Sequence, residues 1–150
     1  MQKNKGYLDE TAQNLRSKGF EHIVRHDIYR KEPFPPAALI NCFMEDGHVK
    51  RSVIRLSSYS DPQAATDRFT EYTANLEKQL QGREVKSQTF TTESNTNNKS
   101  IKIYDLPDCH FMVAVYRMEL PVINKYIIFV AAFSKKYYDS FESVVNELNG

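Results

Sequence analysis

The sequence lacks tryptophan, is poor in glycine and cysteine, and has no long apolar run. Its 150 residues include five glycines and two cysteines. Two cysteines are too few for a disulfide scaffold, so we expect Cys42 and Cys109 to be free, buried thiols, although an oxidising compartment would allow them to pair. No apolar run approaches the roughly 18 to 20 residues that span a bilayer, so we predict no membrane span. The length suits one domain with its own core.

An excess of charge of either sign is also missing. Twenty Lys and Arg residues face 19 Asp and Glu residues, which gives a formal net charge of +1. Dedicated nucleic-acid-binding proteins usually carry a basic excess, because phosphate neutralisation supplies much of their affinity. A nucleic-acid partner is therefore disfavoured. What would favour one is a local patch of four hairpin residues, His48, Lys50, Arg51 and Arg55, with Tyr59 or Phe90 available to stack on bases.

The N-terminal stretch MQKNKGYLDET holds no signal-peptide hydrophobic segment. The chain is predicted to be soluble and cytoplasmic if Met1 is its native start. A mature exported protein or lipoprotein without its signal peptide would show the same pattern, so the localisation stays open.

Common catalytic signatures are absent as well. The sequence contains no GxGxxG, GxxxxGK[ST], HExxH, GxSxG or CxxC motif. Five glycines also leave little material for a phosphate-binding loop. We therefore predict no cofactor and name no catalytic or metal-binding residue.

What is present is clear patterning for helices and strands. Asp46-Gly47 between two β-rich runs predicts a hairpin with strands near 39–45 and 49–57. Asp61 as N-cap and Pro62 at the first helical position predict the start of a long helix. Its apolar stripe, which Gly82 ends, comprises Ala65, Phe69, Tyr72, Leu76 and Leu80.

The two ends of the chain predict shorter elements. We expect an N-terminal helix from about Leu8 to Lys18, then an exposed or edge strand within residues 22–30. The last helix has an apolar face that runs from Tyr138 to Leu148, and Ser134 or Asp139 is expected as its cap.

Four further strands are expected between the long helix and the last one. The polar runs 83–93 and 99–107 form a second hairpin, and the apolar runs 109–120 and 125–133 form central strands joined by PVIN. Because the clear strand connections are hairpins, the fold class is α+β: a largely antiparallel sheet packed by a long central helix, a C-terminal helix and a short N-terminal helix. Residues 1–150 are predicted to form one domain, with the N-terminal helix in 1–20 and the core sheet and helices in 38–150.

Three groups of residues could carry chemistry, and each has a simpler structural explanation. His22 and His26 have a spacing that could chelate a metal, but no third ligand is evident. Cys109 and His110 would point to opposite faces of a strand over 109–119, which excludes a catalytic dyad. Two of the acidic residues at strand ends and turns could converge as an acid/base pair or a calcium site, but turns favour Asp in any case because its side chain bonds the backbone. These residues are Glu45, Asp46, Asp61, Asp105 and Asp108.

From about residue 38 onward, roughly three quarters of the chain, the order of elements resembles the PsbP-like superfamily. The matching segments are the hairpin LINCFMEDGHVKRSVIRL, the helix SDPQAATDRFTEYTANLEKQL, the strands FMVAVYRM and YIIFVAAF, and the helix YYDSFESVVNEL. This superfamily includes photosystem II extrinsic proteins, a Ran-binding nuclear import factor, bacterial lipoproteins and type VI secretion effector chaperones. The resemblance implies a non-catalytic binding domain and transfers no functional residue.

The sequence therefore predicts a non-catalytic protein-binding domain, an accessory, chaperone, inhibitor or immunity-type factor of a bacterium or phage. Its expected partner is another protein, and the candidate contact residues lie in a proline-rich corner and on the first hairpin: Phe34, Pro35, His48, Lys50, Arg51 and Arg55. One alternative is a small hydrolytic enzyme that uses His48, Cys109 or His110 with a turn carboxylate. Another is a domain whose sheet and helices enclose an apolar ligand.

Overall fold

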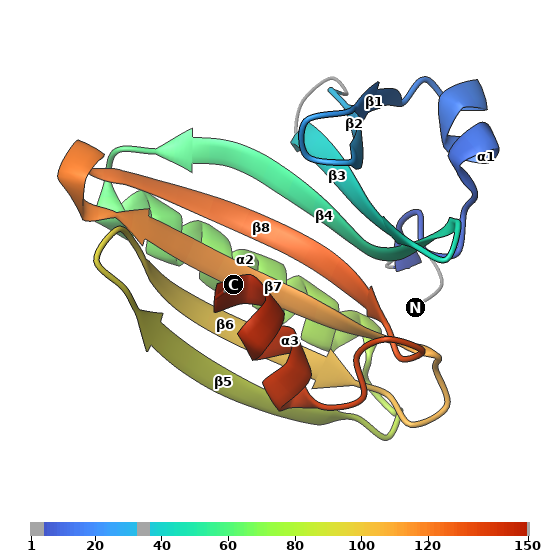
Figure 1. Ribbon diagram of the computed structural model, residues 1–150. Helices are drawn as coiled ribbons and strands as arrows, with labels where there is room; N and C mark the ends of the chain where they lie inside the picture. Colours follow the sequence, from blue (N-terminus) through green and yellow to red (C-terminus); the bar gives the residue numbers. More distant parts are fainter. Residues whose placement is uncertain (1–4, 33–36, 150) are drawn as a thin grey trace.

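The computed structural model describes residues 5–32 and 37–149, which form three α-helices and eight strands (Figure 1). In chain order these are α1 (Ala12–Ser17), β1 (Glu21–Ile23), β2 (Ile28–Lys31), β3 (Ala37–Glu45), β4 (His48–Tyr59), α2 (Pro62–Gln79), β5 (Lys86–Glu93), β6 (Asn98–Asp105), β7 (Phe111–Leu120), β8 (Lys125–Ser134) and α3 (Phe141–Asn149). A short 3-10 helix, Pro121–Ile123, joins β7 to β8.

The strands form one sheet in the order β1-β2-β3-β4-β8-β7-β6-β5. Every neighbouring pair is antiparallel. The α+β prediction is thus confirmed, including the three helices and the hairpins. No helix in the described ranges is long and apolar enough to cross a membrane.

The helices lie on both faces of the sheet. In Figure 1, α2 runs behind the sheet and α3 lies in front of it, while α1 sits at the β1–β2 end. One apolar cluster joins Leu15 of α1 and Leu76 of α2 to Val113 of β7. A second cluster joins Val144 of α3 to Phe133 of β8 on the opposite face. The sheet is therefore the middle layer between two cores.

The long helix begins and ends as its sequence predicts. Asp61 is the N-cap, and its carboxylate accepts a hydrogen bond from the backbone N–H of Gln63 at 3.0 Å. Pro62 opens the helix, where its missing N–H leaves no donor unsatisfied. Gly82, with a φ of +79°, follows the last turn.

The N-terminal elements differ from the predictions in their bounds. The helix starts at Ala12 instead of Leu8, because Thr11 caps it by accepting a hydrogen bond from the N–H of Asn14 at 3.2 Å. Residues 22–30 do not form one strand: β1 and β2 are a hairpin whose turn includes Asp27 at a φ of +51°. Both strands extend the sheet ahead of residue 38.

Two later boundaries also shift. Helix α3 begins at Phe141, and its first turn is closed by Ser140, whose hydroxyl accepts from the N–H of Ser143 at 3.1 Å. Neither Ser134 nor Asp139 is the cap. Cys109 and His110 precede β7, which starts at Phe111, so the strand geometry expected for this pair does not apply.

The two borders of the sheet are unequal. Strand β1 spans three residues at one border, whereas β5 spans eight at the other. All eight residues of β5 pair with β6 without a bulge.

Candidate functional site

The register across the sheet identifies which side chains share the face that α3 covers. Direct partners in antiparallel strands lie on the same face. One such row comprises Leu39, Arg55, Phe129, Tyr116, Ile101 and Phe90. Because the Phe90 ring contacts the Phe141 ring of α3 at a centroid distance of 6.2 Å, this row belongs to the α3 face.

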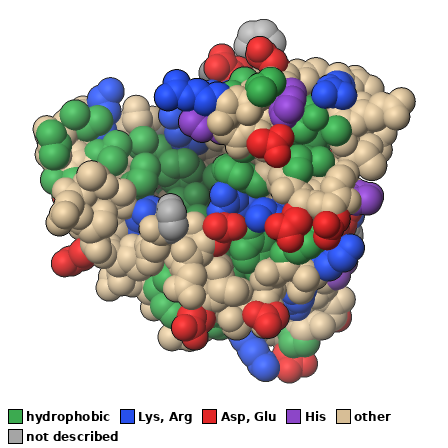
Figure 2. Space-filling view, in the orientation of Figure 1, with side chains coloured by type: hydrophobic (Ala, Val, Ile, Leu, Met, Phe, Trp, Pro, Cys, Tyr) green, Lys and Arg blue, Asp and Glu red, His purple; other side chains and the backbone are tan. Residues whose placement is uncertain are grey.

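Helix α3 leaves part of this face uncovered. In Figure 1 it lies in front of β6 and β7, while no helix crosses the middle of β8 and β4. Figure 2 shows a hollow lined by hydrophobic side chains at this place, beside the C-terminal end of α3. Register places four apolar residues on this part of the face, and we call them the hollow: Val53, Tyr116, Phe129 and Ala131. The first two and Ala131 are buried, whereas Phe129 is half-buried.

Two aromatic rings form the centre of the hollow. Tyr116 and Phe129 stack with a centroid distance of 4.7 Å and an interplanar angle of 9°. Tyr116 is only 5% exposed, and burial raises the pKa of its phenol well above the usual value. Its hydroxyl forms no hydrogen bond with any residue that the structure describes. The Tyr116 ring is thus buried, whereas its hydroxyl is not one of the buried, unpaired atoms of the described residues and reaches solvent.

Arg51 is a cation held against the same face. Its side chain is 14% exposed, and its guanidinium carbon lies 3.7 Å from the centre of the Phe43 ring. Glu147 of α3 supplies the facing negative charge, with 3.4 Å between Nη1 and Oε1. That oxygen also accepts a hydrogen bond from the Tyr138 hydroxyl at 2.6 Å. Arg51 Nε is buried and has no hydrogen-bond partner, so the guanidinium is incompletely satisfied.

Further cations occupy this face. Arg55 is exposed and lies directly opposite Phe129 in the register. Lys99 pairs in register with Met118, and desolvation lowers its pKa. Neither Arg55 nor Lys99 forms an ion pair with a side chain in the described ranges. Positive charge therefore exceeds negative charge around the hollow, although the whole chain is nearly neutral.

The structure places three of the predicted contact residues on one strand, brings two of them close to the same carboxylate and separates a fourth. Lys50, Arg51 and Arg55 lie on β4, and both Lys50 and Arg51 approach Glu147. His48 is at the tip of the β3–β4 hairpin, where its Nδ1 lies 3.1 Å from the carbonyl oxygen of Asp46. Phe34 and Pro35 lie outside the described residues.

The catalytic and metal candidates do not converge. Cys109 lies 3.7 Å from Arg83 Nη2, whereas His110 faces Asp9 at 3.5 Å on an exposed surface. His22 faces Asp27 at 2.9 Å. Within residues 5–32 and 37–149, no three His, Cys, Asp or Glu side chains are grouped to hold a metal ion.

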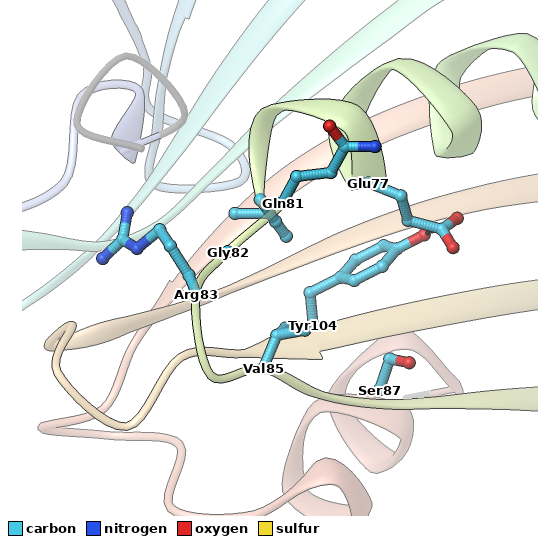
Figure 3. A pocket seen from close by; sticks show the side chains of 8 residues that line it. Glu77, Gln81, Gly82, Arg83, Val85, Ser87 and Tyr104 are labelled. Carbon is cyan, nitrogen blue, oxygen red and sulfur yellow. Dashed lines mark hydrogen bonds between the residues drawn. The ribbon is translucent and has the colours of Figure 1, made fainter.

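An open cavity of about 260 Å³ lies at the C-terminal end of α2 (Figure 3). Three of its polar side chains are already paired: the Tyr104 hydroxyl donates to Glu77 at 2.9 Å, and Arg83 donates to Asp108 at 2.9 Å. Burial and the Glu77 carboxylate raise the pKa of Tyr104.

Comparisons with known proteins add no relative. No protein-family model, no curated protein and no solved structure matches the chain. The resemblance to the PsbP-like superfamily stays a prediction. Tyr116 and Phe129 were not predicted as site residues, because a strand that is apolar on both faces does not indicate which face stays uncovered.

Proposed function

We propose that this chain is a non-catalytic domain that binds another protein through the hollow and the cations around it. The observation that supports the proposal is a hollow lined by apolar side chains beside two cations, Arg55 and Lys99, that have no ion-pair partner among the described side chains. Protein interfaces typically join a desolvated apolar centre, rich in aromatic residues and Arg, to a polar rim. Phe129 and Tyr116 would supply the centre, and Arg55 and Lys99 would supply the rim.

The charges favour an acidic partner surface. Arg55 and Lys99 have no ion-pair partner among the described side chains, whereas Arg51 pairs with Glu147 and Lys50 lies closest to Glu45. Opposite charge on a partner accelerates association and fixes its orientation. We therefore infer that the partner offers an acidic segment that also carries apolar side chains. The predicted resemblance of the layout to PsbP-like proteins favours the same class of function, an accessory or chaperone protein of a bacterium or phage.

The test compares two variants with the same change of charge on opposite faces. Arg55→Glu reverses a cation beside the hollow, and Lys78→Glu reverses an exposed cation on α2. Each purified protein is used as bait in source-cell lysate, and captured proteins are quantified by mass spectrometry. We expect the wild type and Lys78→Glu to retain one partner in stoichiometric amount and Arg55→Glu to lose it. Equal capture by all three baits would show that the hollow is not the docking surface.

A second candidate function, an apolar-ligand-binding domain, is favoured by the apolar lining of the hollow. Native mass spectrometry of the purified chain tests it directly. A bound small molecule that Phe129→Asp displaces would support this function, because a carboxylate on the floor opposes apolar contact. A spectrum of the bare chain in both proteins would favour a protein partner.

A further inference from the structure

We infer that two copies of this chain pair through their β5 strands, antiparallel and about a two-fold axis at Phe90, and so form a dimer with one continuous sheet. The inference goes beyond the proposed function, because the hollow lies on β4, β8 and β7, whereas β5 is the border of the sheet beyond β6. Three features of β5 support it: the direction of its backbone groups, the side chains on its two faces and the charges at its ends.

The backbone of β5 presents a row of unpaired hydrogen-bonding groups. The ladder between β5 and β6 continues into their turn, where the N–H of Ser94 donates to the carbonyl oxygen of Asn97 at 2.9 Å. Because these groups alternate in direction along a strand, every second residue counted back from Ser94 points its N–H and C=O toward β6. The residues between them point theirs away from the sheet: Ser87, Thr89, Thr91 and Glu93.

A strand is the one protein element that can pair with all of these groups at once. In Figure 1, β5 lies at one border of the sheet, and no described strand lies beyond it. All eight of its residues pair with β6 in an unbroken register, so the outward groups are evenly spaced. This spacing suits a second extended strand of similar length, which another copy of β5 provides.

The side chains of β5 are compatible with those of a second copy. A two-fold axis perpendicular to the sheet keeps each face on the same side in both copies, so a residue meets only residues of its own face. With the axis at Phe90, this residue lies opposite its equivalent in the second copy. Gln88 lies opposite Thr92 of the second copy on the same face. Thr89 lies opposite Thr91 of the second copy on the other face, and Thr–Thr pairs of this kind stabilise sheets.

Phe90 gains apolar contact in this arrangement. Its ring is half-buried and contacts the ring of Phe141 in α3 edge to face, with a centroid distance of 6.2 Å and an interplanar angle of 72°. The two-fold axis places a second Phe90 directly beside the first, on the face that α3 covers. The four rings of the two copies then form one row, which removes apolar surface from water and adds a cross-strand aromatic pair.

The charges of β5 favour the antiparallel direction. Lys86 and Glu93 are the two ends of the strand, and the six residues between them are uncharged. Neither end forms an ion pair with a described side chain. In the antiparallel dimer Glu93 of one copy lies opposite Ser87 of the other, next to Lys86, so charges of opposite sign approach. A parallel pair would instead place like charges side by side, which is unfavourable.

The first test measures the mass of the full chain by analytical ultracentrifugation over a range of concentrations. Thr91→Pro removes an N–H that points away from β6, so the ladder within the fold is kept while the new ladder is interrupted. Thr91→Val keeps the N–H and the shape of the side chain and is the matched control. We expect the wild type and Thr91→Val to dimerise as concentration rises, and Thr91→Pro to raise the dissociation constant at least about tenfold. A wild type that stays monomeric, or a dimer that Thr91→Pro leaves unchanged, would overturn the inference.

The second test reads the register and does not depend on proline. Gln88→Cys and Thr92→Cys are each made together with Cys109→Ser, mixed in equal amounts and mildly oxidised. Residues opposite each other in a pair without mutual hydrogen bonds have Cα atoms about 4.5 Å apart, which a disulfide can span. Two equivalent copies of position 88 are offset by four residues, roughly 14 Å, which it cannot span. Peptide mass spectrometry should find disulfides between positions 88 and 92, and a statistical mixture of all three pairings would contradict the register.

The other occupant that β5 could take is an extended segment of a different protein. If the wild type is monomeric and Thr91→Pro, but not Thr91→Val, loses a protein captured from lysate, then β5 binds that protein and the dimer is wrong. The dimer is also independent of the hollow: Arg55→Glu should leave the dissociation constant of the dimer unchanged, because Arg55 lies on β4.

Discussion

At the scale of single residues, burial separates the chemistry of the two cysteines. Both thiols are free, as predicted, but only Cys42 is fully buried; Cys109 is half-buried. Desolvation raises the pKa of Cys42 to about 12, so its reactive thiolate is scarce at neutral pH. We expect iodoacetamide at pH 8 to alkylate Cys109 at least about tenfold faster than Cys42. Peptide mass spectrometry of timed samples measures both rates.

The control for this prediction is Cys109→Ser, which should leave no rapidly modified thiol in the native protein. Cys42 should then react only after denaturant is added. Comparable native-state rates for Cys42 and Cys109 would contradict the burial of the Cys42 side chain in the core.

Glu147 connects α3 to the cations of β4 and makes stability depend on pH. The Tyr138 hydroxyl, followed by the charges of Arg51 and Lys50, holds the pKa of Glu147 below its usual value near 4.5. A carboxylate with a lowered folded-state pKa stabilises the fold above its usual pKa, and this contribution disappears as the pH falls through the lowered value. We expect Glu147→Gln to lower the free energy of unfolding by about 1 kcal/mol at pH 7 and by less at pH 3.

Chemical denaturation at the two pH values measures this difference. Glu142→Gln, an exposed change on the same helix, is the matched control and should show little change between them. A Glu147→Gln effect of the same size at pH 7 and pH 3 would mean that charge is not the cause.

At the scale of elements, the N-cap of α2 makes the clearest contribution. Asp61 satisfies a backbone donor in the first turn of an 18-residue helix. Replacing such a cap with alanine costs about 1 kcal/mol. We expect Asp61→Ala to lower the free energy of unfolding in urea by that amount, and Asp61→Asn to preserve most of it. An alanine variant as stable as the wild type would show that the cap is dispensable.

The elements that were predicted well carry local chemical markers. Asp46-Gly47 marks the β3–β4 turn, and Asp61-Pro62 marks the start of α2, because each residue pair suits the backbone geometry required there. The turn between β1 and β2 has no glycine or proline, and Asp27 adopts the positive φ instead. Without a marker, the hairpin could not be distinguished from a single strand.

At the scale of the whole molecule, the fold class followed from the sequence, but the hollow did not. Strands β7 and β8 are apolar on both faces, which correctly predicts two buried sides of a central sheet. How far α3 extends across one face depends on where it starts, and that boundary was misplaced. The net charge of +1 likewise gave no sign that Arg51, Arg55 and Lys99 gather on one face. These three cations lie on one face because of the register between the strands, which the sequence does not reveal.

The free border at β5 has a consequence for handling the protein. Between Lys86 and Glu93, six consecutive residues of this strand carry no charge, and the pairing with β6 contains no bulge. Charged residues, bulges and short lengths are the usual protection against unwanted pairing at a sheet border. Strand β1 is protected by its length of three residues, but the middle of β5 has no such protection. In concentrated stocks, association should therefore begin at β5, and a lysine at Thr89 or Thr91 is the substitution to choose for long storage.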